Sequence, residues 1–195
     1  NEQYEMPPMP AGARDGIIKG LYRFKPAGSE AKARAQLVGS GAILNEVVRA
    51  QAMLAKYGVA ADVWSATSYN ELYRDAHRVE RWNLLHPTEK PRVPYVTECL
   101  GSAPGVVVAA SDYLKSQPDM LARWIGKPMV TLGTDGFGRS EDRASLRNFF
   151  EVNDRYVAAA TLAALHREGQ IGADVVRQAF KELEIDPDKV NPAHA

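Results

Sequence analysis

The chain has 195 residues, 45% of them hydrophobic, and its 24 Lys and Arg residues balance its 24 Asp and Glu residues. This length allows one sizeable core, and the even charge balance argues against nucleic acid or an anionic membrane as a partner. The longest apolar run, residues 105–110, is too short to span a bilayer. The single cysteine, Cys99, excludes an intrachain disulfide and fits a reducing, cytoplasmic setting.

The opening residues 1–13 are predicted to be irregular, because Pro7, Pro8 and Pro10 withhold amide donors and fix the backbone φ angle. The first residue is Asn and not Met, so we expect a piece of a longer protein that begins in an inter-domain linker. Residues 14–195 are then expected to form one domain.

The next segments alternate between strands and helices. Apolar stretches bounded by turn residues predict three strands: residues 20–25 at an edge of the sheet, and residues 35–40 and 60–67 in its interior. A turn is expected at residues 26–29, an amphipathic helix that ends at Gly58 follows the second strand, and Ser68 can cap the helix after the third. This order implies a parallel sheet with right-handed crossovers.

The alternation is interrupted at residues 82–96, where three prolines among aromatic and charged residues predict an excursion and not a crossover helix. Residues 105–109 are the most apolar run and predict the central strand, buried on both faces. A helical pattern follows over residues 111–125, with a break at Pro118, and residues 126–128 end it.

A strand at residues 129–132 leads into a glycine-rich loop, and Ser140 is predicted to cap the next helix. Two further helices are expected over residues 154–168 and 174–183, followed by a polar tail that docks loosely. Together these elements predict an α/β fold, a three-layer α/β/α sandwich on a mostly parallel sheet with extra C-terminal helices.

Few residues form a recognisable catalytic pattern. The turn at residues 39–41 lies where doubly wound folds hold phosphate, but it lacks both the third glycine of the dinucleotide fingerprint and the lysine of a P-loop. A tight strand-to-helix turn is the simpler interpretation, and phosphate binding is the alternative.

The four histidines have no paired spacing that favours a metal site, and Ser40, Ser65 and Ser111 lack a nucleophile-elbow context. Cys99 is interpreted as a small hydrophobe.

The loop after residues 129–132 is the strongest local candidate for a site. It carries one carboxylate and one guanidinium, Asp135 and Arg139, at the carboxyl end of a predicted strand, where α/β proteins place recognition residues. Two interpretations are open: an ion pair between these residues that holds the loop, or a contact at an interface or the mouth of a site.

Several phrases along the chain are specific enough to indicate a family: NEQYEMP at residues 1–7, LVGSG at 37–41, ERWNLLHP at 80–87, LGTDGFGRS at 132–140 and DKVNP at 188–192. Through them the chain resembles, over essentially its whole length, the carboxyl-terminal domain of the homodimeric bacterial pyruvate dehydrogenases. These are thiamine-dependent, acetyl-transferring oxidoreductases of the transketolase superfamily.

The resemblance implies a transketolase-type α/β/α domain within an enzyme that decarboxylates pyruvate on thiamine diphosphate with Mg²⁺ and acetylates the lipoyl group of a dihydrolipoyl acyltransferase. In that family the cofactor is held by Gly-Asp-Gly and a distant Asn-Asn in an amino-terminal domain, and this chain contains neither motif. We therefore predict no catalytic residue, no cofactor ligand and no metal ligand here, and an isolated fragment without activity.

By the same resemblance, the domain supports dimerisation and frames the active site, with the preceding domains, the homodimer partner and the acyltransferase as its partners. We expect Asp135, Phe137 and Arg139 to contact the cofactor-bearing domains. The second choice for an interface is a set that combines an aromatic side chain with charges, as interfaces often do: Glu80, Arg81, Trp82 and His86. Two alternatives are an autonomous small-ligand or regulatory module and a pure docking module.

Overall fold

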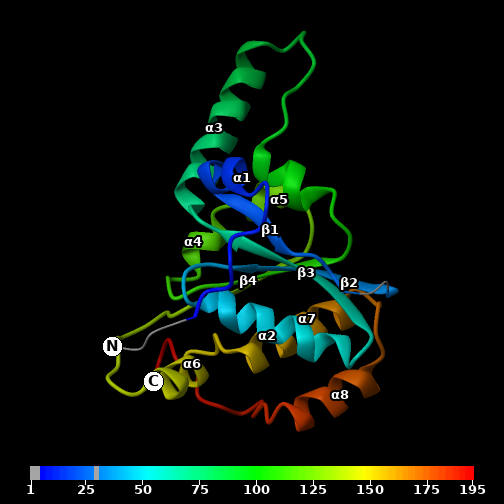
Figure 1. Cartoon of the computed structure of the whole chain (residues 1–195), viewed down its shortest axis with the longest axis vertical. Helices are drawn as coiled ribbons and strands as arrows, with labels where there is room; N and C mark the ends of the chain where they lie inside the picture. The colour runs from blue at the N-terminus through cyan, green and yellow to red at the C-terminus, as the bar shows by residue number, and fades with distance from the viewer. Residues whose placement is uncertain (1–4, 29–30) are drawn as a thin grey trace.

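A five-stranded sheet forms the middle layer of the computed structural model, which describes residues 5–28 and 31–195 (Figure 1). Its strands are β1 (Leu21–Lys25), β2 (Ala33–Gly39), β3 (Val59–Ala66), β4 (Val106–Ala110) and β5 (Met129–Leu132), in the spatial order β1-β3-β2-β4-β5. The pairs β2–β3, β2–β4 and β4–β5 are parallel, and β1 runs antiparallel to β3 at one edge. The mostly parallel sheet and its edge strand are thus confirmed, but β2 is the central strand and not the segment at residues 105–109.

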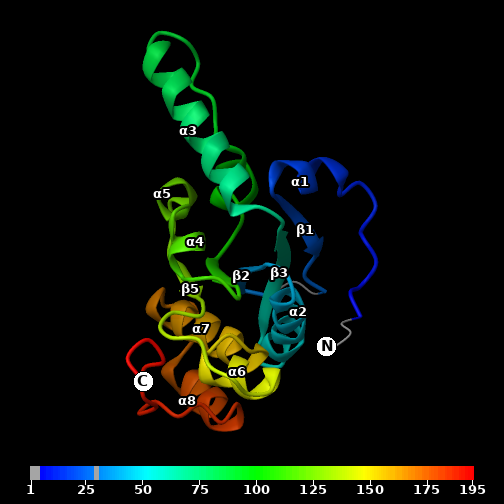
Figure 2. The ribbon, with the colours of Figure 1, turned by 90° about the vertical axis from the view of Figure 1, so that its left-hand side faces the viewer.

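Helices cover both faces of the sheet (Figure 1 and Figure 2). One face carries α2 (Ile43–Ala55), α6 (Arg143–Phe149) and α7 (Asp154–Arg167), with α8 (Ala173–Glu182) packed outside α7. The other carries α1 (Arg14–Lys19), α3 (Tyr69–Leu85), the π-helix η1 (Thr97–Gly101), α4 (Ser116–Asp119) and α5 (Ala122–Ile125). This is the three-layer α/β/α sandwich that the sequence predicted. Within the described ranges, no helix combines the length and hydrophobicity that crossing a bilayer requires.

Alternate residues of each strand contribute to two separate cores. In β2, Leu37 packs with the residues of α2 and α7, whereas Val38 packs with those of α3 and α5. All five residues of β4 are buried, as expected for a strand that is covered on both faces. The side-chain period of two along a strand therefore divides the apolar residues between the layers.

The long helices begin and end where their sequences provide caps. Ser68 caps α3 by accepting a hydrogen bond of 3.2 Å from the amide of Glu71, as predicted, and Asn153 caps α7 in the same way. Gly58 follows α2 with a φ of +71°, a left-handed conformation that favours glycine.

Several predicted boundaries were wrong. α3 continues through Leu85, because no helix breaker occurs before Pro87, so residues 82–85 are helical and the excursion starts only at residue 86. The helical pattern of residues 111–125 is confined to α4 and α5, and Pro118 lies inside α4. α1 and η1 were not predicted.

The two ends of the C-terminal region also differ from expectation. α6 is capped by Asp142 and not by Ser140, since the Asp142 carboxylate accepts a hydrogen bond of 3.0 Å from the amide of Ser145. The tail is anchored more firmly than predicted: the Lys189 ammonium donates to the carbonyl oxygens of Asn148 and Phe149 at 3.1 and 2.6 Å. Of the predicted irregular run-in, residues 5–10 have no regular secondary structure, whereas residues 1–4 and the end of the turn at 29–30 lie outside the described residues.

Close packing just before β4 can be tested at Gly105. Gly58, which also has a positive φ angle but lies after α2, serves as the control. A Cβ atom on Gly105 (φ +83°) would lie 1.7 Å from the carbonyl oxygen of Arg34, whereas one on Gly58 would meet open space. We expect Gly105→Ala to lower the free energy of unfolding by more than about 3 kcal/mol, or to prevent folding. Gly58→Ala should cost only about 1 kcal/mol, because backbone strain is its sole penalty. Urea denaturation measures both values, and equal losses would contradict the steric argument.

Candidate functional site

Two hollows open at the edge where the parallel strands end. The first, here called the arginine pocket, has a volume of about 470 Å³ and lies beside the ends of β4 and β5. The second, here called the hydroxyl cavity, has a volume of about 1040 Å³ and lies beside the ends of β2 and β3. The carboxyl edge of a parallel sheet is where α/β proteins most often bind ligands and partners.

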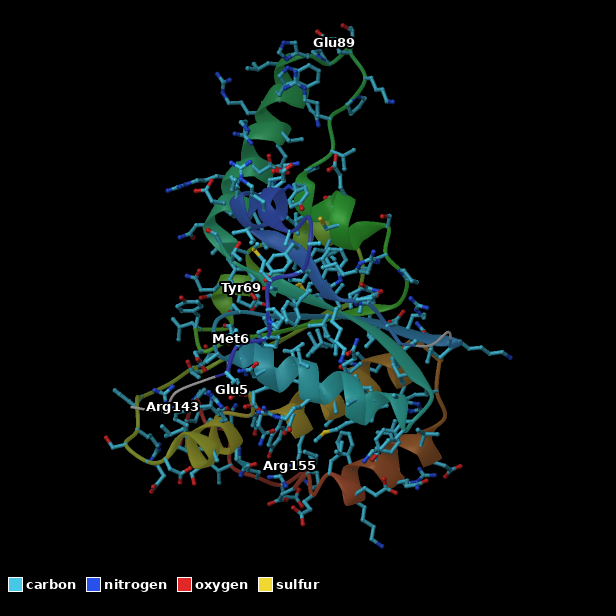
Figure 3. All side chains as sticks on the ribbon, in the orientation of Figure 1. Glu5, Met6, Tyr69, Glu89, Arg143 and Arg155 are labelled. Atoms are coloured by element: carbon cyan, nitrogen blue, oxygen red, sulfur yellow. The ribbon has the colours of Figure 1, made fainter. Side chains whose placement is uncertain are left out.

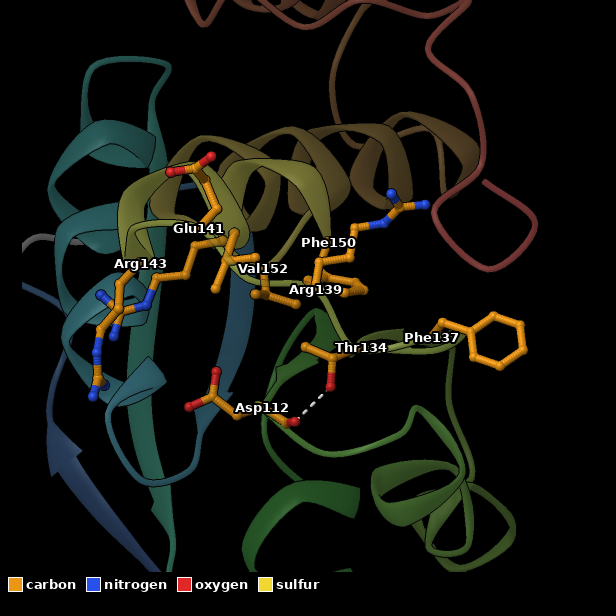
Figure 4. Close-up of a pocket in the computed structure, with 11 residues that line it drawn as sticks. Asp112, Thr134, Phe137, Arg139, Glu141, Arg143, Phe150 and Val152 are labelled. Atoms are coloured by element: carbon orange, nitrogen blue, oxygen red, sulfur yellow. Dashed lines mark hydrogen bonds between the residues drawn. The ribbon is translucent and has the colours of Figure 1, made fainter.

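The arginine pocket combines charged walls with an apolar floor (Figure 4). Its charged side chains are Asp112, Glu141, Arg139, Arg143 and Arg147, and its apolar ones include Phe150 and Val152. Partial desolvation raises the pKa of the Asp112 carboxyl group, and the nearby guanidinium groups of Arg147 and Arg143 oppose this shift. The pocket thus presents mixed charge to whatever covers it.

The predicted Asp135 loop forms one rim of this pocket. Asp135 accepts a hydrogen bond of 3.1 Å from the Lys115 amide and lies 3.9 Å from the Lys115 ammonium. The Arg139 guanidinium lies 4.7 Å from the centroid of the Phe149 ring. Among the described residues, Asp135 is therefore paired with Lys115 and not with Arg139, so the loop is held from outside itself.

Further contacts fix the backbone of this loop. The Thr134 hydroxyl donates to the carbonyl oxygen of Asp112 at 2.5 Å, as the dashed line in Figure 4 shows. The Thr134 amide donates to the carbonyl oxygen of Tyr113 at 3.0 Å. The C-terminal tail lies against Gly136, where a Cβ atom would be 2.9 Å from the carbonyl oxygen of Pro192. The loop is consequently a supported element of the surface.

An apolar surface accompanies the loop. Phe137, at the rim of the pocket, is 87% exposed, and Tyr113 and Leu114 of the neighbouring segment are also exposed. We call these three residues the edge patch. Large exposed apolar side chains that lie close together mark surfaces that a partner covers.

Glu46 holds the wall behind the arginine pocket. Its carboxylate is 3% exposed and accepts hydrogen bonds from the Arg147 guanidinium at 2.9 Å and from the Asp154 amide at 3.0 Å. Arg49 forms a further ion pair with it. These contacts join α2 to α6 and to the start of α7. Glu46 is not among the predicted site residues, although a carboxylate within the apolar face of a predicted helix is a signal that could have identified it.

The second predicted set lies on a projecting arm, formed by the end of α3 and the returning residues 86–94, at the top of Figure 1. The Trp82 ring stacks on His86 with a centroid distance of 4.3 Å, and the Arg92 guanidinium lies 3.7 Å from the Trp82 centroid. The Asn83 amide group exchanges two hydrogen bonds with the Arg92 backbone, of 3.0 and 2.8 Å. These contacts order the arm, while Leu84 near its tip remains 77% exposed.

The four residues of that set do not form one cluster. Glu80 faces α5, where it accepts a hydrogen bond of 2.8 Å from the Trp124 indole and pairs with Arg123, whose hydrogen bond lowers the pKa of the Glu80 carboxyl group. Arg81 is exposed, and only Trp82 and His86 are in contact. The arm projects from the layer opposite α2 and α7, so it and the Asp135 loop form two separate surfaces (Figure 1).

The remaining candidates do not gather into a reactive site. Over residues 5–28 and 31–195, no group of three or more His, Cys, Asp or Glu side chains is placed to hold a metal ion. Cys99 is a free, half-buried thiol whose pKa is raised mainly by burial. Ser40 is buried at the hydroxyl cavity, and its hydroxyl has no hydrogen-bond partner beyond the Tyr69 hydroxyl in the described part of the chain.

Comparison with known proteins gives a consistent result. The family described as the transketolase-like TK C-terminal domain matches residues 20–153. The chain is 50% identical over 194 residues to the pyruvate dehydrogenase E1 component of Pseudomonas aeruginosa and 47% identical over 194 residues to that of Escherichia coli (strain K12). Each match covers 98% of this chain but 22% of the relative, so the chain spans less than a quarter of the length of these proteins.

Solved structures agree on the fold. A transketolase from Leishmania mexicana has a TM-score of 0.56 and 16% identity, over 82% of this chain and 20% of that one. A transketolase from Pichia stipitis has a TM-score of 0.53 and 18% identity, over 84% of this chain and 20% of that one. At such low identity the likeness is one of fold alone.

The buried carboxylate behind the pocket can be tested by Glu46→Gln. This substitution keeps the shape but removes the charge that faces two arginines, and we expect it to lower the free energy of unfolding by about 3 kcal/mol. The control is Glu71→Gln, whose partner Arg74 is exposed, and which should change the value by less than about 0.5 kcal/mol. Chemical denaturation at neutral pH measures both. If Glu46→Gln costs no more than its control, then Glu46 does not hold α2 to α6 and α7.

Proposed function

The chain belongs to the family of transketolase-like TK C-terminal domains, and on that premise we propose that it is the carboxyl-terminal domain of a pyruvate dehydrogenase (acetyl-transferring). That enzyme decarboxylates pyruvate on thiamine diphosphate with Mg²⁺ and transfers the acetyl group to the lipoyl group of an acyltransferase. One observation carries the proposal: 47–50% identity, over 98% of this chain, to a segment of the pyruvate dehydrogenase E1 components. In this role the domain belongs to a cytoplasmic homodimer.

The residues of this chain do not fit the cofactor. The Gly-Asp-Gly and Asn-Asn motifs that would hold the diphosphate and the metal do not occur in it, and its described carboxylates and histidines form no metal-binding group. We therefore assign no step of the thiamine chemistry to this domain. Its function is to support the domains that contain the active site.

We assign the first contact with those domains to the Asp135 loop and the edge patch. Phe137 supplies exposed apolar area and Arg139 a guanidinium at the same pocket, a combination that is common at interface centres. Asp135 has a positioning role, because its carboxylate is bonded to Lys115. The loop is already supported before any partner binds, which lowers the entropic cost of association.

We assign the second contact, with the acyltransferase, to the arm. The stack of Trp82, His86 and Arg92 orders the arm, and the exposed Leu84, Leu85 and Val93 supply the apolar contact area. Glu80 and Arg81 flank this surface, and Glu80 mainly secures α3 to α5.

The competing role, an autonomous small-ligand or regulatory module, is favoured by the volume of the hydroxyl cavity. Titration of the chain by itself with thiamine diphosphate and with pyruvate separates the two roles. A supporting domain should bind neither compound, whereas saturable binding of either would contradict our assignment.

The edge contact is tested by Phe137→Ala and Arg139→Ala in the complete polypeptide that contains this chain. Loss of an interface anchor should raise the dimer dissociation constant and lower turnover, each by about tenfold. Analytical ultracentrifugation and a pyruvate-dependent assay measure these values. The matched control is Ile18→Ala on α1, which is also exposed (65%) but lies away from the edge patch, and should change neither. No change in either quantity for both loop variants would remove the proposed contact.

The arm contact is tested by Leu84→Ser. Because Leu84 is 77% exposed, the substitution should change the free energy of unfolding by less than about 0.5 kcal/mol. It should weaken binding to the acyltransferase several-fold and leave dimerisation unchanged. Val190→Ser, in the tail and 66% exposed, serves as the control. Unaltered acyltransferase binding, or a change in dimer dissociation instead, would contradict this assignment.

A further inference from the structure

The hydroxyl cavity is large enough for a metabolite and is built from neutral side chains. Its volume of about 1040 Å³ reaches the size of typical cofactor and metabolite sites. Met6 and Met9 of the run-in form one wall, and Tyr22 and Phe24 of β1 form another. No charged side chain among the described residues lines it. Figure 3 labels Met6 and Tyr69, which both line this cavity beside the start of α2.

Two buried hydroxyl groups at this cavity have no partner beyond each other. Ser40 is 5% exposed and Tyr69 is 6% exposed, and their hydroxyls lie side by side with no further hydrogen-bond partner in the described part of the chain. Burial raises the pKa of Tyr69, and the nearby Ser40 hydroxyl opposes this shift, so the phenol is a neutral donor at physiological pH. Buried polar groups in native proteins are nearly always paired. Two such hydroxyls side by side can donate to an acceptor that enters the cavity.

The start of α2 faces the same cavity. The residue at its N-cap position is Ala42, whose side chain cannot accept a hydrogen bond, whereas α3 and α7 are capped by Ser68 and Asn153. The amides of Gly41 and Ala42 donate to no acceptor within the described residues. The positive end of the helix dipole and these free amides favour an anion.

The turn before α2 brings these donors together. A Cβ atom on Gly39 would lie 2.8 Å from the Cα atom of Leu44, so glycine is needed for α2 to start this close to the end of β2. Gly41 has a φ of +53°, and a Cβ atom there would meet open space. The amides at the turn are therefore accessible from the cavity.

We propose that the hydroxyl cavity binds a phosphate group, which accepts hydrogen bonds from the Ser40 and Tyr69 hydroxyls and from the amides of Gly41 and Ala42 just before α2. The apolar walls would hold the organic part of a phosphate monoester. A phosphate suits this site because its several oxygens accept many hydrogen bonds at once, and because no described carboxylate at the cavity repels it. The inference goes beyond the proposed function, since it requires neither a partner domain nor thiamine chemistry.

The test is calorimetric titration of inorganic phosphate into the complete polypeptide, with chloride at equal ionic strength as the reference. Saturable binding is expected, and Tyr69→Phe and Ser40→Ala should each weaken it by about tenfold, since each removes a hydrogen bond to a charged group. The matched controls are Tyr57→Phe and Ser102→Ala, whose hydroxyls bond to Glu182 and to the Glu98 carbonyl oxygen outside the cavity. Neither control should change the affinity.

Thermal denaturation separates loss of binding from loss of folding. Without phosphate, Tyr69→Phe and Ser40→Ala should unfold close to the temperature of the unmodified protein, because each removes a buried hydroxyl that has no partner beyond the other one. Added phosphate should raise the unfolding temperature of the unmodified protein and of the controls but not of these two variants. Absence of saturable phosphate binding, or equal affinity in all variants, would overturn the inference. Because neither measurement involves turnover, that failure would leave the proposed role of the domain intact.

Discussion

The parallel pairing of β2 with β3 on one side and with β4 on the other is the constraint on which the rest of the structure depends. In this register Gly39 lies opposite both Ser65 and Ala110, so the three strands end at the same level. The following loops therefore meet at one edge of the sheet. The two hollows, the Asp135 loop and the start of α2 all lie there as a consequence, as is general for parallel sheets.

The polar groups buried near that edge divide into two kinds. Glu46 is fully paired with arginines and a backbone amide, so it connects helices and is unavailable to a ligand. Ser40 and Tyr69 are similarly buried but have no partner beyond each other within the described residues. A fully paired buried group contributes to the structure, whereas these two hydroxyls can still bond to a further molecule. This difference separates the structural wall of the arginine pocket from the hydroxyl cavity.

A supporting role within a larger enzyme explains why the domain has two exposed surfaces at different places. The edge patch continues the ordered carboxyl edge of the sheet, while the arm extends from the opposite layer (Figure 1). Each is ordered internally, the loop by Lys115 and the tail, the arm by the stack on Trp82. Such preorganised surfaces suit contacts with neighbouring domains and subunits.

The sequence by itself determined the family, the α/β/α class and most strands and long helices, because side-chain periods of two and 3.6 and the capping residues are local features. Tertiary structure alone decided that β2 is central, that Asp142 caps α6, and that Asp135 pairs with Lys115, 20 positions away, and not with nearby Arg139. It also separated Glu80 from Trp82 and placed Tyr69 beside Ser40. The partner of a polar side chain depends on which loops the sheet register brings together, and sequence spacing does not contain that register.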